Sequence, residues 1–317
     1  MTIYFLWLVL SLVILSFGAD FLVRGAGAIA LRVGITPLVV GLTIVAFGTS
    51  APELVVSVNA SLKDQGAMAI GNIVGSNIFN IAVILGMAAL VSPLVVKPQL
   101  VKFDTPLCIF VTILFSAMFH DQFMSRIEGG ILFSGLIAYT VYSVISSRKE
   151  TAKAKAEAEA LGEELPKPSN NPVRDMGFIA LGGLGLWYGG EMLVKNAVLI
   201  AQGFGVSEAI IGLTIVSAGT SAPELATSVV ASFQKQTDIA VGNIVGSNLF
   251  NILSVIGLAS LINPISAVGI NLSDILVMNG LTILLLVLMM RGYRLFRGEG
   301  LLLLFIYGGY LYYLWPK

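Results

Sequence analysis

The heptapeptide GTSAPEL occurs twice in this chain, at residues 48–54 and again at residues 219–225. Both copies lie inside long apolar stretches, and each places a glutamate, Glu53 or Glu224, directly after a proline. Proline removes a backbone N–H and breaks a helix. An acidic side chain at the centre of a membrane helix costs about 3 kcal/mol on insertion scales. The fold and the function must together explain why the chain carries this combination twice.

The composition of the chain indicates a membrane protein. Of its 317 residues, 56% are hydrophobic and only 11% are charged, which is far outside the range of soluble domains. The formal net charge is zero and the basic residues do not cluster on a soluble face, so no nucleic-acid partner is expected. Cys108 and His120 are the only residues of their types, which excludes an internal disulfide and argues against a zinc or copper site.

The apolar windows predict an all-α protein that crosses the bilayer many times. A spanning helix needs about 20 mostly apolar residues. Ten windows meet this requirement: 3–30, 36–62, 69–92, 103–120, 126–147, 173–199, 207–233, 240–262, 271–290 and 299–316. If both termini lie outside, most Lys and Arg residues fall in inside loops, and only Lys63, Arg126 and Lys317 are left outside. This bias predicts both termini outside and the central linker inside.

The two halves of the chain repeat each other at a constant offset of 171 residues. GLTIVAFGTSAPEL at 41–54 matches GLTIVSAGTSAPEL at 212–225, and GNIVGSNIFNI at 71–81 matches GNIVGSNLFNI at 242–252. Each half holds five spans, an odd number, so the second half enters the membrane from the opposite side. This pattern is typical of secondary transporters. We therefore expect two inverted five-helix repeats, at residues 1–147 and 173–317, with broken helices 2 and 7.

The linker at residues 148–172 is rich in Ala, Lys and Glu and then in Pro. Its composition predicts a solvated helical turn or two followed by a flexible tether. It is too short for a folded sensor domain, and it contains no calcium-loop motif of the EF-hand type.

The proline of each heptapeptide should open the helix and supply oxygen ligands. Pro52 leaves the Gly48 carbonyl without a helical donor, and Ala51 is pushed away from helical geometry. We expect the carbonyls of roughly 46–49 to face inward without helical hydrogen bonds, beside the hydroxyls of Thr49 and Ser50 and the Glu53 carboxylate. The second half repeats this arrangement with Gly219, Thr220, Ser221, Pro223 and Glu224.

The helix that follows each heptapeptide adds further polar groups on one face. Asn72, Ser76 and Asn80 are spaced four apart, as are Asn243, Ser247 and Asn251 in the second half. We interpret Asn72 and Asn243 as packing residues that support the broken helices. Gly242 and Gly246, like their counterparts Gly71 and Gly75, form small-xxx-small pairs that allow a neighbouring helix to approach closely.

These residues are all hard oxygen ligands, which suit calcium and sodium. The two carboxylates balance one calcium ion or two sodium ions, and no Lys or Arg lies in these segments to pair with them. Cations or protons should therefore neutralise the carboxylates. By contrast, Asp104 and Asp274 are interpreted as anchors at the membrane interface.

At these residues the chain resembles the calcium/cation antiporter superfamily, in particular its prokaryotic sodium/calcium exchanger-like members. G-T-S-x-P-E followed by G-S-N-x-x-N in each half carries the resemblance, which spans the whole chain. It implies a carrier that exchanges several sodium ions for each calcium ion by alternating access, electrogenically, with no cofactor besides the transported ions. In such a fold, helices 1 and 6 are long and tilted and slide against the other eight. GTSAPE favours sodium as the counter-ion, since proton/calcium exchangers typically differ around the glutamate.

The resemblance also implies a ligand set. In the first half the ligands would be the Ala46 carbonyl, Thr49, Ser50, Glu53, Ser76 and Asn80. In the second half they would be the Ser217 carbonyl, Thr220, Ser221, Glu224, Ser247 and Asn251. Some relatives carry Asp where this chain has Asn251, so this site has one carboxylate fewer, and potassium co-transport is less expected.

Three other functions fit parts of the sequence. The same glutamates would serve a proton/calcium exchanger by taking up protons when calcium leaves. A cation channel is less consistent with inverted repeats and broken helices, and an intramembrane enzyme is the weakest alternative. By analogy, a short linker without a sensor suggests a prokaryotic cytoplasmic membrane. We also expect the protein to function as a monomer.

Overall fold

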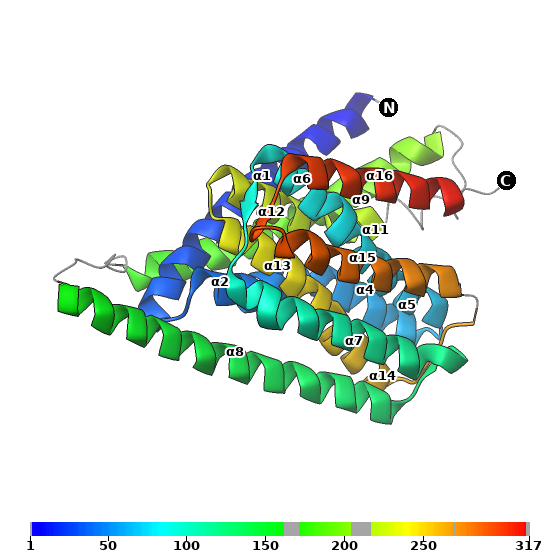
Figure 1. The fold of residues 1–317 in the computed structure, drawn as a ribbon. Coiled ribbons are helices and arrows are strands. Elements are labelled where there is room, and N and C mark those ends of the chain that lie inside the picture. Colours follow the sequence, from blue (N-terminus) through cyan, green and yellow to red (C-terminus); the bar gives the residue numbers. More distant parts are fainter. Residues whose placement is uncertain (1, 162–170, 204–216, 269, 315–317) are drawn as a thin grey trace.

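A computed structural model of the chain describes residues 2–161, 171–203, 217–268 and 270–314. These residues are almost entirely helical (Figure 1). The first half contains α1 (Thr2–Val33), α2 (Pro37–Val40), η1 (Gly41–Val45), α3 (Ala46–Thr49), α4 (Ala51–Leu62), α5 (Gly66–Phe79), η2 (Asn80–Leu85), α6 (Gly86–Val91), β1 (Leu94–Val95), η3 (Leu100–Asp104), α7 (Thr105–Met118), η4 (Phe119–Asp121), β2 (Phe123–Met124) and α8 (Arg126–Leu161). The second half contains α9 (Pro172–Gly203), α11 (Ser217–Thr220), α12 (Ala222–Phe233), α13 (Thr237–Phe250), η6 (Asn251–Ile256), α14 (Gly257–Ile262), β3 (Ile265–Ser266), α15 (Leu272–Met290), β4 (Arg294–Leu295) and α16 (Arg297–Leu314).

Several of these helices are long and apolar enough to cross a membrane. Six such helices occur within the described residues, or seven if the bent pair Pro37–Thr49 and Ala51–Leu62 is one span. The helices α9 and α16 occupy two further predicted windows, whereas the window 207–233 lies partly outside the described residues. The all-α membrane class is therefore confirmed, and the count of ten spans stays a prediction.

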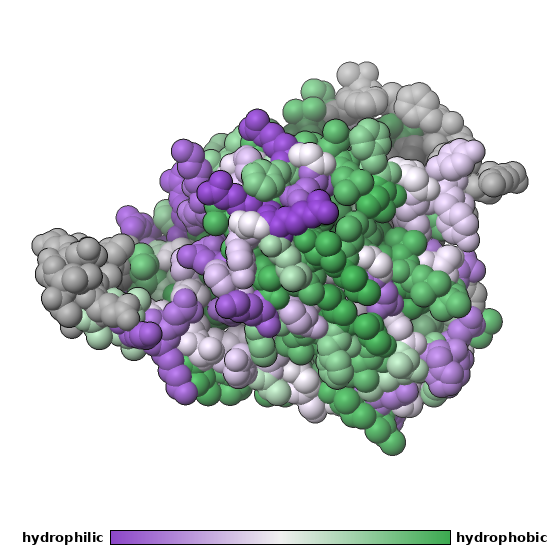
Figure 2. Space-filling model, in the orientation of Figure 1, coloured by the Kyte–Doolittle hydropathy of each residue, from purple (hydrophilic) through white to green (hydrophobic). Residues whose placement is uncertain are grey.

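Two helices form the centre of the bundle. In the span Thr237–Ile262, 89% of the most apolar window is buried inside the protein, and in Gly66–Val91 the figure is 78%, compared with 22% for α8. Large hydrophobic side chains on the outer helices are exposed, among them Phe110, Leu276 and Phe305. Figure 2 shows hydrophobic side chains over much of the visible face, with many hydrophilic ones gathered toward its left-hand edge. Such an apolar surface suits lipid rather than water.

Local details of the backbone recur at the spacing of the sequence repeat. Left-handed residues close the same turn in each half, Asp64 and Lys235 in one case and Gln122 and Tyr293 in the other. Two short antiparallel strand pairs join the halves: β1 pairs with β4, and β2 pairs with β3. These two pairs lie at opposite ends of α7, so the halves are linked on both sides of the bundle.

The chain ends and the start of the linker lie on different sides of the molecule. Figure 1 shows the N-terminal end of α1 and the C-terminal end of α16 on one side, and the C-terminal end of α8 on the other. The helix α8 continues to Leu161, so the predicted turn or two of helix at the start of the linker is too short. A helix of 36 residues is about 54 Å long, and α8 therefore projects well beyond a bilayer core of about 30 Å. The tether predicted after it lies mostly outside the described residues.

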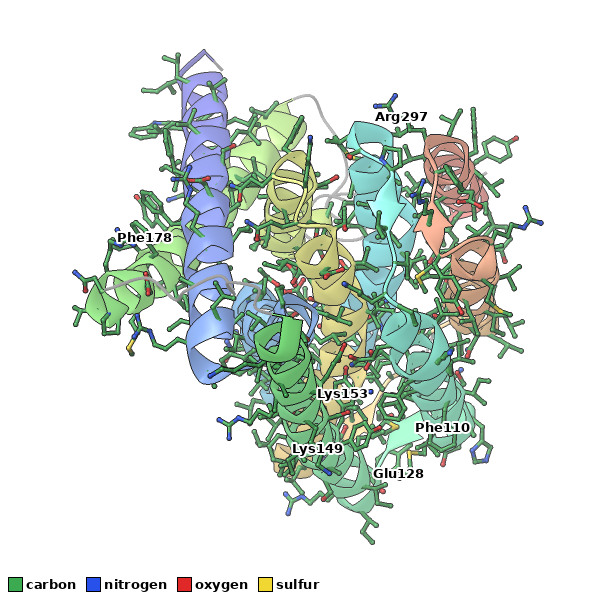
Figure 3. The ribbon with its side chains drawn as sticks, turned by 60° about the vertical axis from the view of Figure 1, so that its left-hand side comes forward. Phe110, Glu128, Lys149, Lys153, Phe178 and Arg297 are labelled. Carbon is green, nitrogen blue, oxygen red and sulfur yellow. The ribbon has the colours of Figure 1, made fainter. Side chains whose placement is uncertain are left out.

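The helices α1 and α9 pack closely along their length. A side chain at Gly182 would place its Cβ 2.5 Å from the Leu22 nitrogen, so the contact requires glycine there. Arg32 of α1 forms an ion pair of 3.3 Å with the buried Asp175 of α9. Phe178, labelled in Figure 3, stacks on Phe21 with ring centres 5.4 Å apart. These contacts hold the two helices together as one unit.

Candidate cation-binding site

Both GTSAPEL segments break their helices at the serine. The helix α3 ends at Thr49, Ser50 has φ −84° and ψ 7°, and α4 begins at Ala51. The two parts are bent by 48°. In the second half α11 ends at Thr220, and Ser221 has φ −88° and ψ 7° before α12 begins. The break predicted from the prolines is therefore confirmed in both halves.

The two glutamates lie in the first turns of α4 and α12, and both are fully buried. The positive end of a helix dipole favours an acidic side chain at that position. The Ser50 hydroxyl donates to Glu224 Oε1 at 2.8 Å, and the Ser221 hydroxyl donates to Glu53 Oε1 at 2.9 Å. Each broken helix therefore holds the glutamate of the other, and the two carboxylates share one site between the halves.

The neighbouring helices widen where they reach this site. At Asn80 the helix α5 passes into the π-helical turn η2, and at Asn251 α13 passes into η6. Such wide turns are frequent at functional sites. The hydroxyl oxygens of Ser76 and Ser221 are 3.1 Å apart, and Ser247 lies near the Glu224 carboxyl. The described candidate side chains are all buried, with Thr220 the most exposed at 7%.

Several oxygens of the site lack a partner within the described residues. They are Oε2 of each glutamate, the amide oxygens of Asn80 and Asn251, and the Ser247 hydroxyl. Buried polar atoms are normally hydrogen-bonded, so this set has the capacity to bind a ligand. Carboxylate, amide and hydroxyl oxygens together suit a hard cation such as calcium or sodium. None of the ion pairs seen in the described residues involves Glu53 or Glu224.

The two carbonyls predicted as backbone ligands, those of Ala46 and Ser217, are less clearly available to a cation. The Ala46 carbonyl accepts the Ser50 N–H at 3.0 Å and the Thr49 hydroxyl at 3.4 Å. The expectation that this carbonyl has lost its helical hydrogen bond is therefore wrong, because the helix continues for one more turn before Pro52 takes effect. Ser217 begins α11, and its side chain lies outside the described part of the chain.

Asn72 and Asn243 hold the broken helices in place, as predicted. The Asn243 amide donates to Ser228 at 2.9 Å, and its oxygen lies 3.2 Å from the Thr49 hydroxyl of the other half. The Asn72 amide makes the matching bonds to Ser57 and Thr220. The sequence analysis did not identify Ser57 and Ser228 as partners of these amides. Their position four residues after Glu53 and Glu224 could have indicated it.

A second pair of amides ties the two central helices together. The Asn77 amide donates to the Asn248 carbonyl, and the Asn248 amide donates to the Asn77 carbonyl, both at 3.3 Å. The Asn80 amide donates to the Asn248 side-chain oxygen at 3.0 Å, and the Asn251 amide donates to that of Asn77 at 2.9 Å. These bonds use the amide N–H groups and leave the oxygens of Asn80 and Asn251 available to a cation.

Replacing Asn77 by leucine should destabilise the protein and disturb the site. The change leaves the Asn251 side-chain amide without its acceptor, at about 1–3 kcal/mol, and removes one of the donors to the Asn248 carbonyl. Thermal unfolding in detergent, followed by fluorescence, measures the loss. The matched control is Asn271→Leu, because Asn271 is exposed and its side chain caps no helix. An Asn77→Leu midpoint equal to that of the control would contradict this role of the amide pair.

Known proteins resemble this chain over nearly its whole length. Residues 3–145 and 175–315 match the family described as "Sodium/calcium exchanger protein". The chain is 37% identical over 98% of its length to "Putative antiporter CaxA" of Alkalimonas amylolytica, of which it covers 98%. It is 31% identical to "Sodium/calcium exchanger MaX1" of Methanosarcina acetivorans, with 98% of each chain covered.

A solved structure of the sodium-calcium exchanger NCX_Mj, soaked with sodium and calcium ions, has the same fold. The TM-score is 0.84 at 28% identity, and 98% of each chain is covered. The fold and the buried oxygen site therefore define an integral membrane transporter of the cation antiporter class, not an enzyme. The chain belongs to the sodium/calcium exchanger family.

Proposed function

We propose that this protein is an electrogenic antiporter that exchanges sodium for calcium by alternating access. The observation that carries the proposal is the pair of fully buried carboxylates, each held by the serine of the other half and each with one oxygen left unpaired. A calcium ion between Glu53 and Glu224 would receive one oxygen from each and leave the site neutral.

Calcium and sodium would compete because they need the same carboxylates. Two sodium ions neutralise the pair as well as one calcium ion does, so a third sodium ion makes the exchange electrogenic. An empty site would carry two uncompensated charges in a low-dielectric interior, which is costly. The protein would therefore change sides only when loaded, and this requirement couples the two ion gradients.

The proposed ligands are those implied by the family resemblance. They are Ala46, Thr49, Ser50, Glu53, Ser76 and Asn80 in the first half, and Ser217, Thr220, Ser221, Glu224, Ser247 and Asn251 in the second. Most of the side chains in this set are neutral and buried, and their oxygens surround the two carboxylates. For Ala46, the coordination would use the carbonyl together with the hydrogen bonds that it already accepts.

We place the protein in a prokaryotic cytoplasmic membrane, as a monomer with both termini outside. A relative that is 37% identical over 81% of this chain is "Inner membrane protein YrbG" of Escherichia coli, of which 79% is covered. The inside location of the linker rests on the distribution of Lys and Arg. The domain limits at 147 and 173 lie close to the limits of the two family matches, 3–145 and 175–315, which supports a division into two related halves. Their inverted orientation rests on the odd number of predicted spans in each half.

Ion flux in proteoliposomes tests the proposal. Vesicles loaded with sodium are diluted into sodium-free buffer, and uptake of radioactive calcium is measured. Parallel controls replace the sodium gradient by a lithium, potassium or proton gradient. Uptake should require internal sodium, and an inside-positive potential should accelerate it, because more positive charge leaves than enters. Uptake that follows only the pH gradient would assign the protein to proton/calcium exchange. Calcium conductance without any counter-ion would assign it to channels.

A further inference from the structure

A second group of polar side chains is buried between α7 and α8, away from the candidate cation site. Asp104 lies at the end of η3, just before α7, and Tyr139 lies on α8. The Tyr139 hydroxyl donates to Asp104 Oδ1 at 3.1 Å. The sequence placed Asp104 at the membrane interface, but its exposed fraction is 0%. That interpretation is wrong, because the side chain turns into the bundle toward α8.

Three oxygens of this group have no hydrogen-bond partner within the described residues. They are Asp104 Oδ2, the Thr105 hydroxyl and the Ser143 hydroxyl. Thr105 follows Asp104 directly, and Ser143 lies one helical turn after Tyr139, near its hydroxyl. The side chains are buried, with exposed fractions of 0% for Thr105 and 1% for Ser143. Serine and threonine in a helix commonly bond back to the preceding turn, and these two do not.

No cationic side chain neutralises this carboxylate in the described part of the chain. The ion pairs found there involve Asp20, Asp175 and Asp238 but not Asp104. Lys102, the basic residue nearest in sequence, is exposed. A buried carboxylate is paired with a cation or takes up a proton, and the neighbouring side chains that interact with Asp104, namely Tyr139 and Gln99, carry no charge.

The second half of the chain provides an internal comparison. Tyr310 donates to Asp274 Oδ1 at 2.8 Å, so the same aspartate–tyrosine bond links α15 and α16. Both of these side chains are partly exposed. The residue that follows Asp274 is Ile275 and the residue four after Tyr310 is Leu314, so both local positions of the hydroxyls are apolar in the second half. The hydrogen bond therefore does not require the hydroxyls, which accompany only the fully buried copy.

We propose that Asp104, Thr105 and Ser143 bind a sodium ion that braces α7 against α8. The ion would be bound by Asp104 Oδ2 and the two hydroxyls, while Tyr139 fixes the other carboxylate oxygen. One carboxylate matches the single charge of sodium. Calcium would need a second negative charge and six to eight oxygens. This ion is a resident of the fold and is separate from the ions exchanged at Glu53 and Glu224.

The test uses the full-length protein with Glu53→Gln and Glu224→Gln, which removes the carboxylates of the candidate cation site. Thermal unfolding in detergent is compared in sodium, potassium and choline chloride at one ionic strength. Sodium alone should raise the midpoint by several degrees, since a ligand of the native state stabilises it. Adding Asp104→Asn should abolish that rise. Asp274→Asn is the matched control and should retain it, although it alters the same kind of tyrosine hydrogen bond.

A second measurement covers the case in which the triple variant fails to fold. Binding of radioactive sodium to the otherwise unchanged protein should fall by one ion per chain in Thr105→Val/Ser143→Ala, which keeps every carboxylate. The site is overturned if the sodium response survives Asp104→Asn, or if the sodium count of the hydroxyl variant is unchanged. A midpoint that responds to pH but not to sodium would show that Asp104 holds a proton instead. Each result is independent of whether sodium drives calcium flux.

Discussion

Replacing Glu53 by glutamine is expected to abolish sodium-driven calcium uptake, and Glu224→Gln should have the same effect. Each change removes one of the two negative charges that balance calcium and leaves the remaining buried glutamate unable to neutralise it alone. Removing one partner of a buried ionic pair costs about 3–5 kcal/mol. That loss corresponds to a decrease in calcium affinity of about 100-fold or more.

The measurement is initial calcium uptake into sodium-loaded proteoliposomes at matched protein density. Glu128→Gln is a suitable control, because Glu128 caps the start of α8 and glutamine keeps its hydrogen bond to the Ser125 N–H. It should transport as the unchanged protein does. Full exchange by either Glu53→Gln or Glu224→Gln would show that calcium is bound elsewhere.

Replacing Gly246 by valine should unfold or severely destabilise the protein. A Cβ at this position would lie 2.6 Å from the Leu42 carbonyl oxygen, 2.7 Å from Leu42 Cα and 2.9 Å from Ala46 Cβ. The α13 backbone therefore packs directly on η1 and α3, as the small-xxx-small pair predicted. Backbone atoms cannot move aside as a flexible side chain can, so we expect a loss of more than about 3 kcal/mol.

The loss would be read from the unfolding midpoint in detergent and from calcium uptake by the surviving fraction. Gly280→Val makes the same substitution within α15, where the side chain would meet no described atom within 4 Å. This control should change the midpoint little. A well-folded and active Gly246→Val protein would mean that the contact of α13 with Ala46 is looser than the structure indicates.

The sequence predicted those parts of the site that depend on local chemistry. Pro52 and Pro223 cannot donate a backbone hydrogen bond, so the break one or two residues before them followed from residue type alone. The shared face of Ser76 and Asn80 followed from helical spacing. The offset of the repeat then transferred each of these conclusions to the second half.

Features that depend on how the two halves meet were not predictable from the sequence. Nothing local indicates that Ser50 bonds to Glu224 rather than to its own helix, or that Asn77 and Asn248 exchange hydrogen bonds. The burial of Asp104 was also not predictable from local sequence. Its charge suggested a place at the membrane interface, whereas contact with α8 encloses the side chain. The hydrogen bond that the Ala46 carbonyl keeps could not be predicted, because residue types indicate a bend but neither its exact position nor its angle.

The two small strand pairs restrict which movements are open to this protein. The strand pairs β1–β4 and β2–β3 join the two halves at both ends of α7. A hinge motion that separates the halves would have to break at least one of these pairs. Neither strand pair includes α1 or α9. These two helices contact each other through Gly182 and through the Arg32–Asp175 ion pair. We therefore expect a large rearrangement to move α1 and α9 together, relative to the helices that the strand pairs join.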